Sequence, residues 1–257
     1  MNIWSVFILS VVEGITEFLP ISSTAHLQIT SQLLGLSLVG SVSSFIIFIQ
    51  LGAIVSVIVI YFDQLKSNLF LWLKIITAFL PTAIIGFSLY SVIKNLFLLN
   101  LSITAYALIL GGFFLIGFEW WYKKSNKQKV VSLDKISYKQ AFIIGCVQAL
   151  AIIPGVSRSG ATIVGGMSLG LSRQAIVEFS FLLAIPTMFS ATVYDLWKNS
   201  QDLNLNNVGW LVLGGSLSFV FAYVSVKWLV KFISTHDFTY FGFYRIIIGL
   251  FILGFLV

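Results

Sequence analysis

Two glutamates, a serine and a histidine lie within one short stretch near the N-terminus of a chain that is otherwise largely apolar. The sequence EGITEFLPISSTAH places Glu13 and Glu17 four residues apart, so both carboxylates project from one face of a helix that Pro20 ends. His26 comes three residues after Ser23, on the same side of a helix that restarts there. We expect these four residues to be catalytic, with the histidine activating the serine or protonating a leaving oxygen.

A second polar stretch, PGVSRSGAT at residues 154–162, contains an arginine among hydroxyl side chains. The proline and glycine end any preceding helix, and the small polar residues after them favour the start of a new one. A helix start presents unpaired backbone N–H groups and a positive dipole end, to which the arginine adds a guanidinium fork. This pattern predicts a phosphate or diphosphate site. Its expected ligands are Ser22, Ser157, Arg158, Ser159 and Thr162.

Two carboxylates beside a phosphate site are typical of a hard divalent cation that shares the phosphate oxygens. We therefore expect Glu13 and Glu17 to bind Mg²⁺ or Ca²⁺. A structural alternative stays open, in which Arg158 pairs with one glutamate inside a broken membrane helix and the other glutamate is protonated.

The composition indicates the class of protein whose elements must position these groups. Of the 257 residues, 58% are hydrophobic and 9% are charged, which is typical of a polytopic membrane protein. The N-terminus lacks the features of a cleaved signal peptide, and a single cysteine excludes an intrachain disulfide or a cysteine-based metal cluster. Six apolar segments are long enough to span a bilayer: 42–61, 71–93, 101–122, 175–197, 208–226 and 238–257.

Two further apolar regions, 3–36 and 140–171, are interrupted at residues 20–24 and 154–159. Most of the resulting pieces are too short to cross a membrane, so each region predicts a re-entrant helical hairpin. Unwound backbone at membrane depth is tolerated only where it is buried in protein or lines a cavity. We therefore expect the two hairpin tips to meet inside the helical bundle.

The two halves of the chain resemble each other. VVEGITEFLPIS aligns with CVQALAIIPGVS, FIIFIQLGA with FSFLLAIPT, and YALILGGFFLIGF with YRIIIGLFILGF, in the same order and at offsets of about 134 to 138 residues. Each half has one hairpin and three spans, and because three is odd the halves have opposite orientations, an inverted repeat. We predict an all-α fold with a single integral membrane domain, 1–257. Repeat 1 covers about 1–122, a basic cytoplasmic loop 123–139, and repeat 2 about 140–257.

The basic residues orient this topology. With the loop 123–139 placed inside, eleven basic residues face the inside and only Lys94 and Lys198 face out, as the positive-inside rule requires. The net charge of +6 therefore reflects membrane topology and predicts no nucleic-acid partner. The first hairpin then enters from outside and the second from inside.

EGITEFLPISSTAH and PGVSRSGAT resemble the two signature regions of the undecaprenyl-diphosphate phosphatase family, also called the bacitracin-resistance protein family. The similarity extends to GLSRQAIVEFSFLLAIP and to the closing YRIIIG. This resemblance implies hydrolysis of undecaprenyl diphosphate to the monophosphate lipid carrier for cell-wall precursors, with Ser23 as nucleophile or phosphate ligand and Arg158 holding the diphosphate. It also implies a bacterial plasma membrane and a site that opens to the outer face. Family members often have glycine before the histidine, where this chain has Ala25.

We thus expect a membrane diphosphatase whose partners are a polyprenyl diphosphate and the bilayer; the sequence leaves the oligomeric state open, and a homodimer is compatible with it. A transporter or flippase for a polyprenyl phosphate or another anion is the main alternative, because inverted repeats with broken helices also build transporters. A transporter has no use for a nucleophile beside a metal-binding pair. A purely structural protein would leave the buried charges unexplained.

Two further polar residues lie within apolar segments. Arg245 could reach the diphosphate or pair with Asp195 or Glu178, and Gln148 is the counterpart of Glu13 in the second half.

Overall fold

The computed structural model describes residues 1–38, 40–89, 100–124, 132–198 and 208–257, and every regular element in these ranges is a helix. The expected all-α class is therefore correct. In chain order the helices are α1 (Ile3–Thr16), α2 (Ser23–Leu33), α3 (Ser41–Ile60), α4 (Phe62–Ser67), α5 (Leu69–Ser88), α7 (Leu101–Lys123), η2 (Leu133–Lys135), α8 (Tyr138–Gln148), η3 (Ala149–Ile152), α9 (Arg158–Ser168), α10 (Arg173–Lys198), α11 (Val208–Ile233) and α12 (Thr239–Phe255).

Five of these helices are long and apolar enough to cross a membrane: α3, α5, α7, α10 and α11. They match five of the six predicted spans, and the sixth forms α12, a shorter apolar helix of 17 residues. Residues 90–93 of one predicted span, Lys94, and residues 125–131 of the predicted basic loop lie outside the described residues. The length and composition of these helices define a multi-pass membrane protein.

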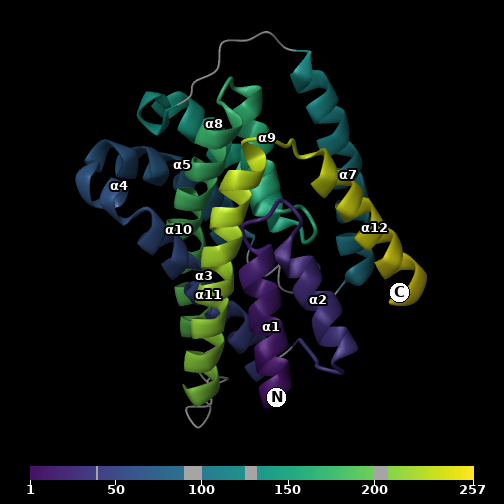
Figure 1. Cartoon of the computed structure of the whole chain (residues 1–257). Helices are drawn as coiled ribbons and strands as arrows, with labels where there is room; N and C mark the ends of the chain where they lie inside the picture. Colours follow the sequence, from purple (N-terminus) through teal and green to yellow (C-terminus); the bar gives the residue numbers. More distant parts are fainter. Residues whose placement is uncertain (39, 90–99, 125–131, 199–207) are drawn as a thin grey trace.

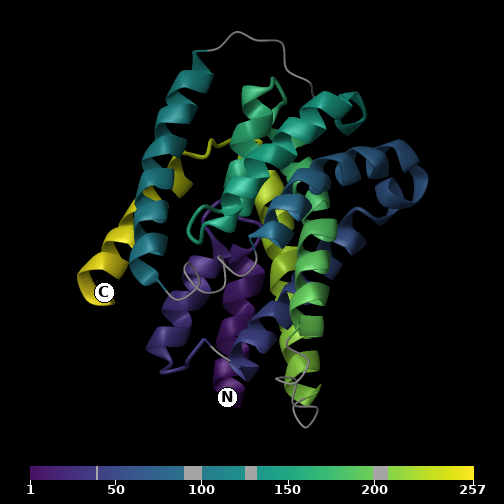
Figure 2. The ribbon, with the colours of Figure 1, turned by 180° about the vertical axis from the view of Figure 1, so that it is seen from behind.

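The two interrupted regions each form a pair of helices joined by a short unwound segment. In the first, α1 and α2 flank residues 17–22, which we call the first tip; in the second, α8 with η3 and α9 flank residues 153–157, the second tip. Figures 1 and 2 show the two pairs extending from opposite ends of the molecule, so that their tips lie side by side near its middle. The tips are in direct contact, because Ser159 Oγ at the start of α9 donates a hydrogen bond of 2.8 Å to the carbonyl of Leu19.

Small residues let the helices around the tips approach closely. α3 packs against α11 where a Cβ atom on Gly52 would lie only 2.1 Å from the carbonyl oxygen of Gly215. α8 packs against α5 in the same way, because a Cβ atom on Gly145 would lie 1.9 Å from the carbonyl oxygen of Ala78. Close backbone approach at small residues is the usual way in which membrane helices gain packing energy. These contacts hold the long helices as a frame around the two tips.

Candidate functional site

A cavity of about 120 Å³ lies where the two tips meet. The first tip and α2 line it with polar side chains, and the second tip and α9 do so from the other side. Two long helices, α3 and α10, complete its wall. The polar residues around it are Glu17, Ser22, Ser23, Thr24, Gln50, Ser157, Arg158 and Thr187. The cavity thus brings together five predicted residues from both interrupted regions: Glu17, Ser22, Ser23, Ser157 and Arg158.

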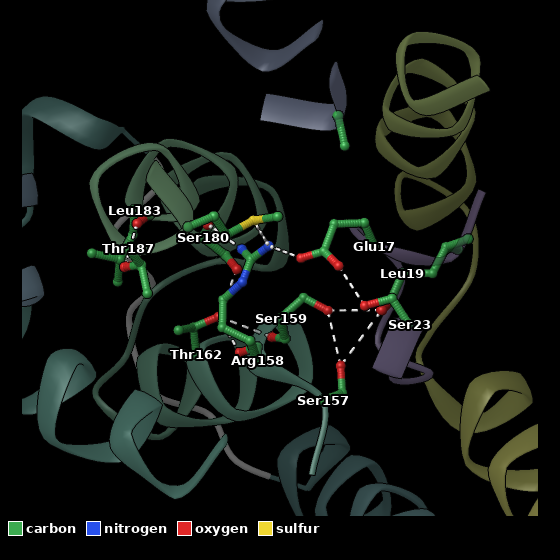
Figure 3. Close-up of polar contacts among 12 residues, drawn as sticks. Glu17, Leu19, Ser23, Ser157, Arg158, Ser159, Thr162, Ser180, Leu183 and Thr187 are labelled. Atoms are coloured by element: carbon green, nitrogen blue, oxygen red, sulfur yellow. Dashed lines mark hydrogen bonds and ion pairs between the residues drawn. The ribbon is translucent and has the colours of Figure 1, made fainter. Parts of the chain in front are cut away.

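Glu17 lies between Arg158 and Ser23 and accepts a hydrogen bond from each (Figure 3). Arg158 Nη2 donates to Glu17 Oε1 at 2.9 Å, and Ser23 Oγ donates to Glu17 Oε2. Arg158 Nη1 also donates to the carbonyl of Ser180 at 3.0 Å, which fixes the guanidinium against α10. The side chains of Arg158 and Glu17 are only 13% and 8% exposed, so water screens this ion pair little.

The ion pair agrees with the structural alternative in one respect, because Arg158 does bind a glutamate. A structural role does not explain two further observations. The second oxygen of Glu17 accepts the Ser23 hydroxyl, and all three residues border the same cavity. Each buried charge costs about 2.5 to 3.5 kcal/mol at membrane depth, and a packing role alone does not require a serine hydroxyl and a cavity beside them.

The local backbone at the first tip aims Ser23 at Glu17. Ser22 has a φ of 70°, and among the described residues no other non-glycine residue has a positive φ. Such a conformation costs about 1 to 2 kcal/mol in an L-residue. It reverses the chain after Pro20, so that α2 begins at Ser23 with the hydroxyl directed toward Glu17. Strain at this position is consistent with a functional constraint.

The second tip follows the predicted pattern of helix end and helix start. Gly155 has a φ of +92°, and a Cβ atom there would lie 2.5 Å from the carbonyl oxygen of Thr104, so only glycine fits. α9 then begins at Arg158, with Ser157 as its N-cap: Ser157 Oγ accepts a 3.1 Å hydrogen bond from the backbone N–H of Gly160. The predicted helix start at this loop is confirmed.

Four predicted site residues lie outside the cavity lining: Glu13, which is described below, and Thr162, Ser159 and His26. Thr162 is fully buried, and its hydroxyl lies 2.6 Å from Ser180 Oγ and 2.9 Å from the carbonyl of Ser159. Ser159 donates to Leu19 of the first tip, and neither hydroxyl borders the cavity. Their observed contacts position the second tip and differ from the predicted diphosphate contacts. His26 also lies off the cavity lining.

His26 faces α12, and its expected contact with Ser23 is absent. Its Nδ1 lies 2.8 Å from the carbonyl of Ser22, which can only accept, so Nδ1 carries a proton. In the neutral ring Nε2 then accepts from the hydroxyl of Tyr244 at 2.8 Å, and the two rings stack with centroids 5.5 Å apart. Ser23 donates to Glu17, and the contact of His26 with the first tip is its hydrogen bond to the Ser22 carbonyl.

Glu13 lies one turn before Glu17, is fully buried and does not border the cavity. Neither of its carboxylate oxygens has a hydrogen-bond partner, which agrees with a bound cation and also with the protonated glutamate of the structural alternative. A buried carboxylate without donors needs a proton or a cation. Among the described residues no group of three or more acidic, histidine or cysteine side chains could hold a metal. Two carboxylates fit Mg²⁺ or Ca²⁺, provided that substrate oxygens or water complete the shell.

Sequence reasoning missed three polar residues of the cavity wall: Thr24 on α2, Gln50 on α3 and Thr187 on α10. A glutamine inside the apolar segment FIIFIQLGA was the available signal for Gln50. Gln148 does not border the cavity itself, but its Nε2 donates to Thr187 at 3.2 Å and to Thr82 at 2.9 Å. It therefore supports the wall from behind.

The fold and the site together define a multi-pass helical membrane protein that holds a serine, a carboxylate and an arginine where two broken helices meet, a set of groups suited to a phosphate ester or anhydride. Residues 6–251 match the family described as "Bacitracin resistance protein BacA", and the chain belongs to that family.

Full-length relatives carry one common name. A protein of Wolinella succinogenes named undecaprenyl-diphosphatase is 50% identical over 256 residues, which cover 100% of this chain and 99% of the relative. Proteins with the same name from Aquifex aeolicus and Persephonella marina are each 47% identical, over 97% and 100% of both chains respectively. The similarity thus includes both hairpins and all the long helices.

Proposed function

We propose that this chain is an undecaprenyl-diphosphate phosphatase, which hydrolyses undecaprenyl diphosphate to undecaprenyl phosphate and phosphate and so confers bacitracin resistance. The observation that carries the proposal is the hydrogen-bonded series Ser23, Glu17 and Arg158 on one cavity at the meeting point of the two tips. Ser23 is the nucleophile, Glu17 the proton acceptor and Arg158 the positively charged side chain that binds phosphate, and Glu17 contacts both of the others. The names of the full-length relatives support the same substrate.

In the proposed reaction, Ser23 Oγ attacks the terminal phosphorus and Glu17 takes the hydroxyl proton through the contact that it already makes. The bond from that phosphorus to the bridging oxygen breaks, and undecaprenyl phosphate leaves with the electron pair. Arg158 exchanges its contact with Glu17 for the phosphate oxygens and stabilises their developing charge. Water then hydrolyses the phosphoserine, which releases phosphate and restores Ser23.

We further propose that Glu13 and Glu17 bind a divalent cation, Mg²⁺ or Ca²⁺. The unpartnered oxygens of Glu13 support this assignment. When bound, the cation would neutralise charge on the substrate's phosphate groups.

The inverted repeat is proposed as the architecture that brings the two tips together. Helix packing supports it, because α1 packs on α11 as α8 packs on α5, and α3 packs on α11 as α10 packs on α5. The alignment of the two halves relates α1 to α8, α3 to α10 and α5 to α11, so each contact has its counterpart in the other half. With the basic loop inside, α1 and α2 enter from the outer face of a bacterial plasma membrane, so the site opens to that face and the isoprenoid tail enters sideways from the bilayer.

The test is phosphate release from a polyprenyl diphosphate by the detergent-purified protein. We expect release in Mg²⁺, loss in chelator, and a fall of about 10² to 10⁴-fold in Ser23→Ala and in Arg158→Ala. Ser168→Ala is the matched control, because Ser168 is exposed at the far end of α9 and bonds only within its own helix. It should retain full activity.

Two outcomes would contradict the proposal at different points. Full activity in Ser23→Ala would show that Ser23 is not the nucleophile, and wild-type protein that binds the lipid without releasing phosphate would show that the chain is not a hydrolase. The second result would favour transport of a polyprenyl phosphate, since two broken helices that meet at mid-depth also suit a transporter.

A further inference from the structure

A second buried arginine, Arg245 on α12, forms hydrogen bonds to both tips at once. It is 4% exposed, and its Nη1 donates to the carbonyl of Pro20 in the first tip at 3.2 Å. Its Nη2 donates to the carbonyl of Gly155 in the second tip at 2.8 Å and to that of Ala107 on α7 at 3.3 Å. Four segments distant in sequence therefore meet at one guanidinium.

The guanidinium contacts carbonyl groups and lies outside the cavity lining. The sequence-based alternatives, a pairing with Asp195 or Glu178, are therefore wrong, because its donors bind Pro20, Gly155 and Ala107. Unwound backbone at membrane depth needs internal donors. Arg245 supplies one to each tip.

Glycines make the space that this guanidinium fills. A Cβ atom on Gly111 of α7 would lie 2.1 Å from Arg245 Nη2, and one on Gly160 of α9 would lie 3.3 Å from Nη1. The guanidinium is thus enclosed by backbone on two sides. A planar fork with donors on both ends can reach two carbonyls in fixed directions, whereas a lysine ammonium is a single point on a flexible stem.

We infer that Arg245 is a positioning residue for the proposed phosphatase: it sets the relative placement of the two tips, and through them the contacts of Glu17 with Ser23 and Arg158. The inference rests on the proposed function for its kinetic consequence only. The catalytic groups come from two separate hairpins, and a misplacement of about 1 Å between reacting groups lowers rates by about 10²-fold. Loss of the fork should therefore affect turnover more than substrate binding.

The first test compares Arg245→Lys with wild type by steady-state kinetics and by amide hydrogen exchange of the full-length protein in detergent. We expect kcat to fall about 10 to 100-fold, with KM within about threefold. Exchange should rise in peptides that contain the first tip or the second tip and stay unchanged in α3 and α11.

The second test displaces the same guanidinium by a substitution in α7. Gly111→Ala should lower kcat because the added methyl group displaces Arg245 Nη2, whereas Gly117→Ala on the same helix meets nothing within 4 Å and should be neutral. In the double variant with Arg245→Lys, the lysine leaves room for the methyl group. We expect its loss to equal that of Arg245→Lys alone.

Three results would overturn the inference. They are unchanged exchange in both tips of Arg245→Lys, a rise in KM with kcat unchanged, which would make Arg245 a substrate ligand, and losses that multiply in the double variant. Wild-type protein without phosphatase activity would instead reject the proposed function. In that case the exchange measurement still decides whether Arg245 positions the tips.

Discussion

Glu17 has two hydrogen-bond contacts that a single substitution can separate. In Glu17→Gln, the amide oxygen still accepts from Arg158 Nη2, but the amide nitrogen faces Ser23 Oγ and cannot take its proton. We expect kcat to fall about 10² to 10⁴-fold, with KM changed only a few-fold, in steady-state phosphate release. Retention of the arginine contact should keep the variant folded.

Glu178→Gln is the matched control for that prediction. Glu178 lies on α10 outside the cavity lining and accepts from Gln174 one turn earlier, so the same chemical change there should be neutral. Wild-type turnover in Glu17→Gln would exclude Glu17 as the proton acceptor. The remaining role of Glu17 would then be to bind Arg158.

The kinds of chemical group at the site could be predicted from the sequence, whereas several of their partners could not. A rare charge in an apolar segment is visible in the sequence, so Glu17, Ser23 and Arg158 were identified correctly as neighbours. The partner of His26 is Tyr244, 218 residues away, and no local spacing encodes that contact. The contacts of Arg245 are hidden in the sequence for the same reason, because its partners are backbone carbonyls, which every residue has.

At the scale of elements, the breaks in helices were more predictable than their ends. Proline and glycine act on the backbone locally, so the interruptions near Pro20 and Pro154 were found in the sequence. α11 instead runs to Ile233, past the predicted end at 226. Lys227 and Lys231 end the apolar stretch there, but lysine is a good helix former and the helix continues.

The contact between α3 and α11 predicts that a methyl group added at Gly52 lowers stability, whereas one added at Gly215 does not. Gly52→Ala places a Cβ atom 2.1 Å from the backbone carbonyl of Gly215, which cannot move without shifting α11. We expect a loss of about 1 to 3 kcal/mol of stability, measured as a lower Tm in detergent. Gly215→Ala is the matched control, because its nearest neighbour, Phe48 Cε1 at 3.6 Å, is in ordinary contact. Equal Tm values for the two variants would contradict this packing.

At the scale of the whole molecule, the side from which the first hairpin enters the membrane depends on which end of the bundle faces the cytoplasm. Figures 1 and 2 place the end of α10 at the same end as the N-terminus, and the start of α8 at the opposite end. Lys198 and Lys139 lie at these two ends and are both exposed. The excess of basic residues on the side of Lys139 predicts that this side is cytoplasmic.

Single cysteines at these two positions test that orientation in a Cys146→Ala background, which removes the chain's one native thiol. A membrane-impermeant maleimide added to intact cells should label Lys198→Cys and leave Lys139→Cys unlabelled until the membrane is permeabilised. The reverse pattern would place the N-terminus of α1 and the end of α2 on the cytoplasmic side, so that the first hairpin would enter from that side. Labelling of both positions in intact cells would mean that the chain inserts in two orientations. Some molecules would then present the first hairpin to the outside and others to the cytoplasm, and undecaprenyl phosphate could be produced from either side of the membrane.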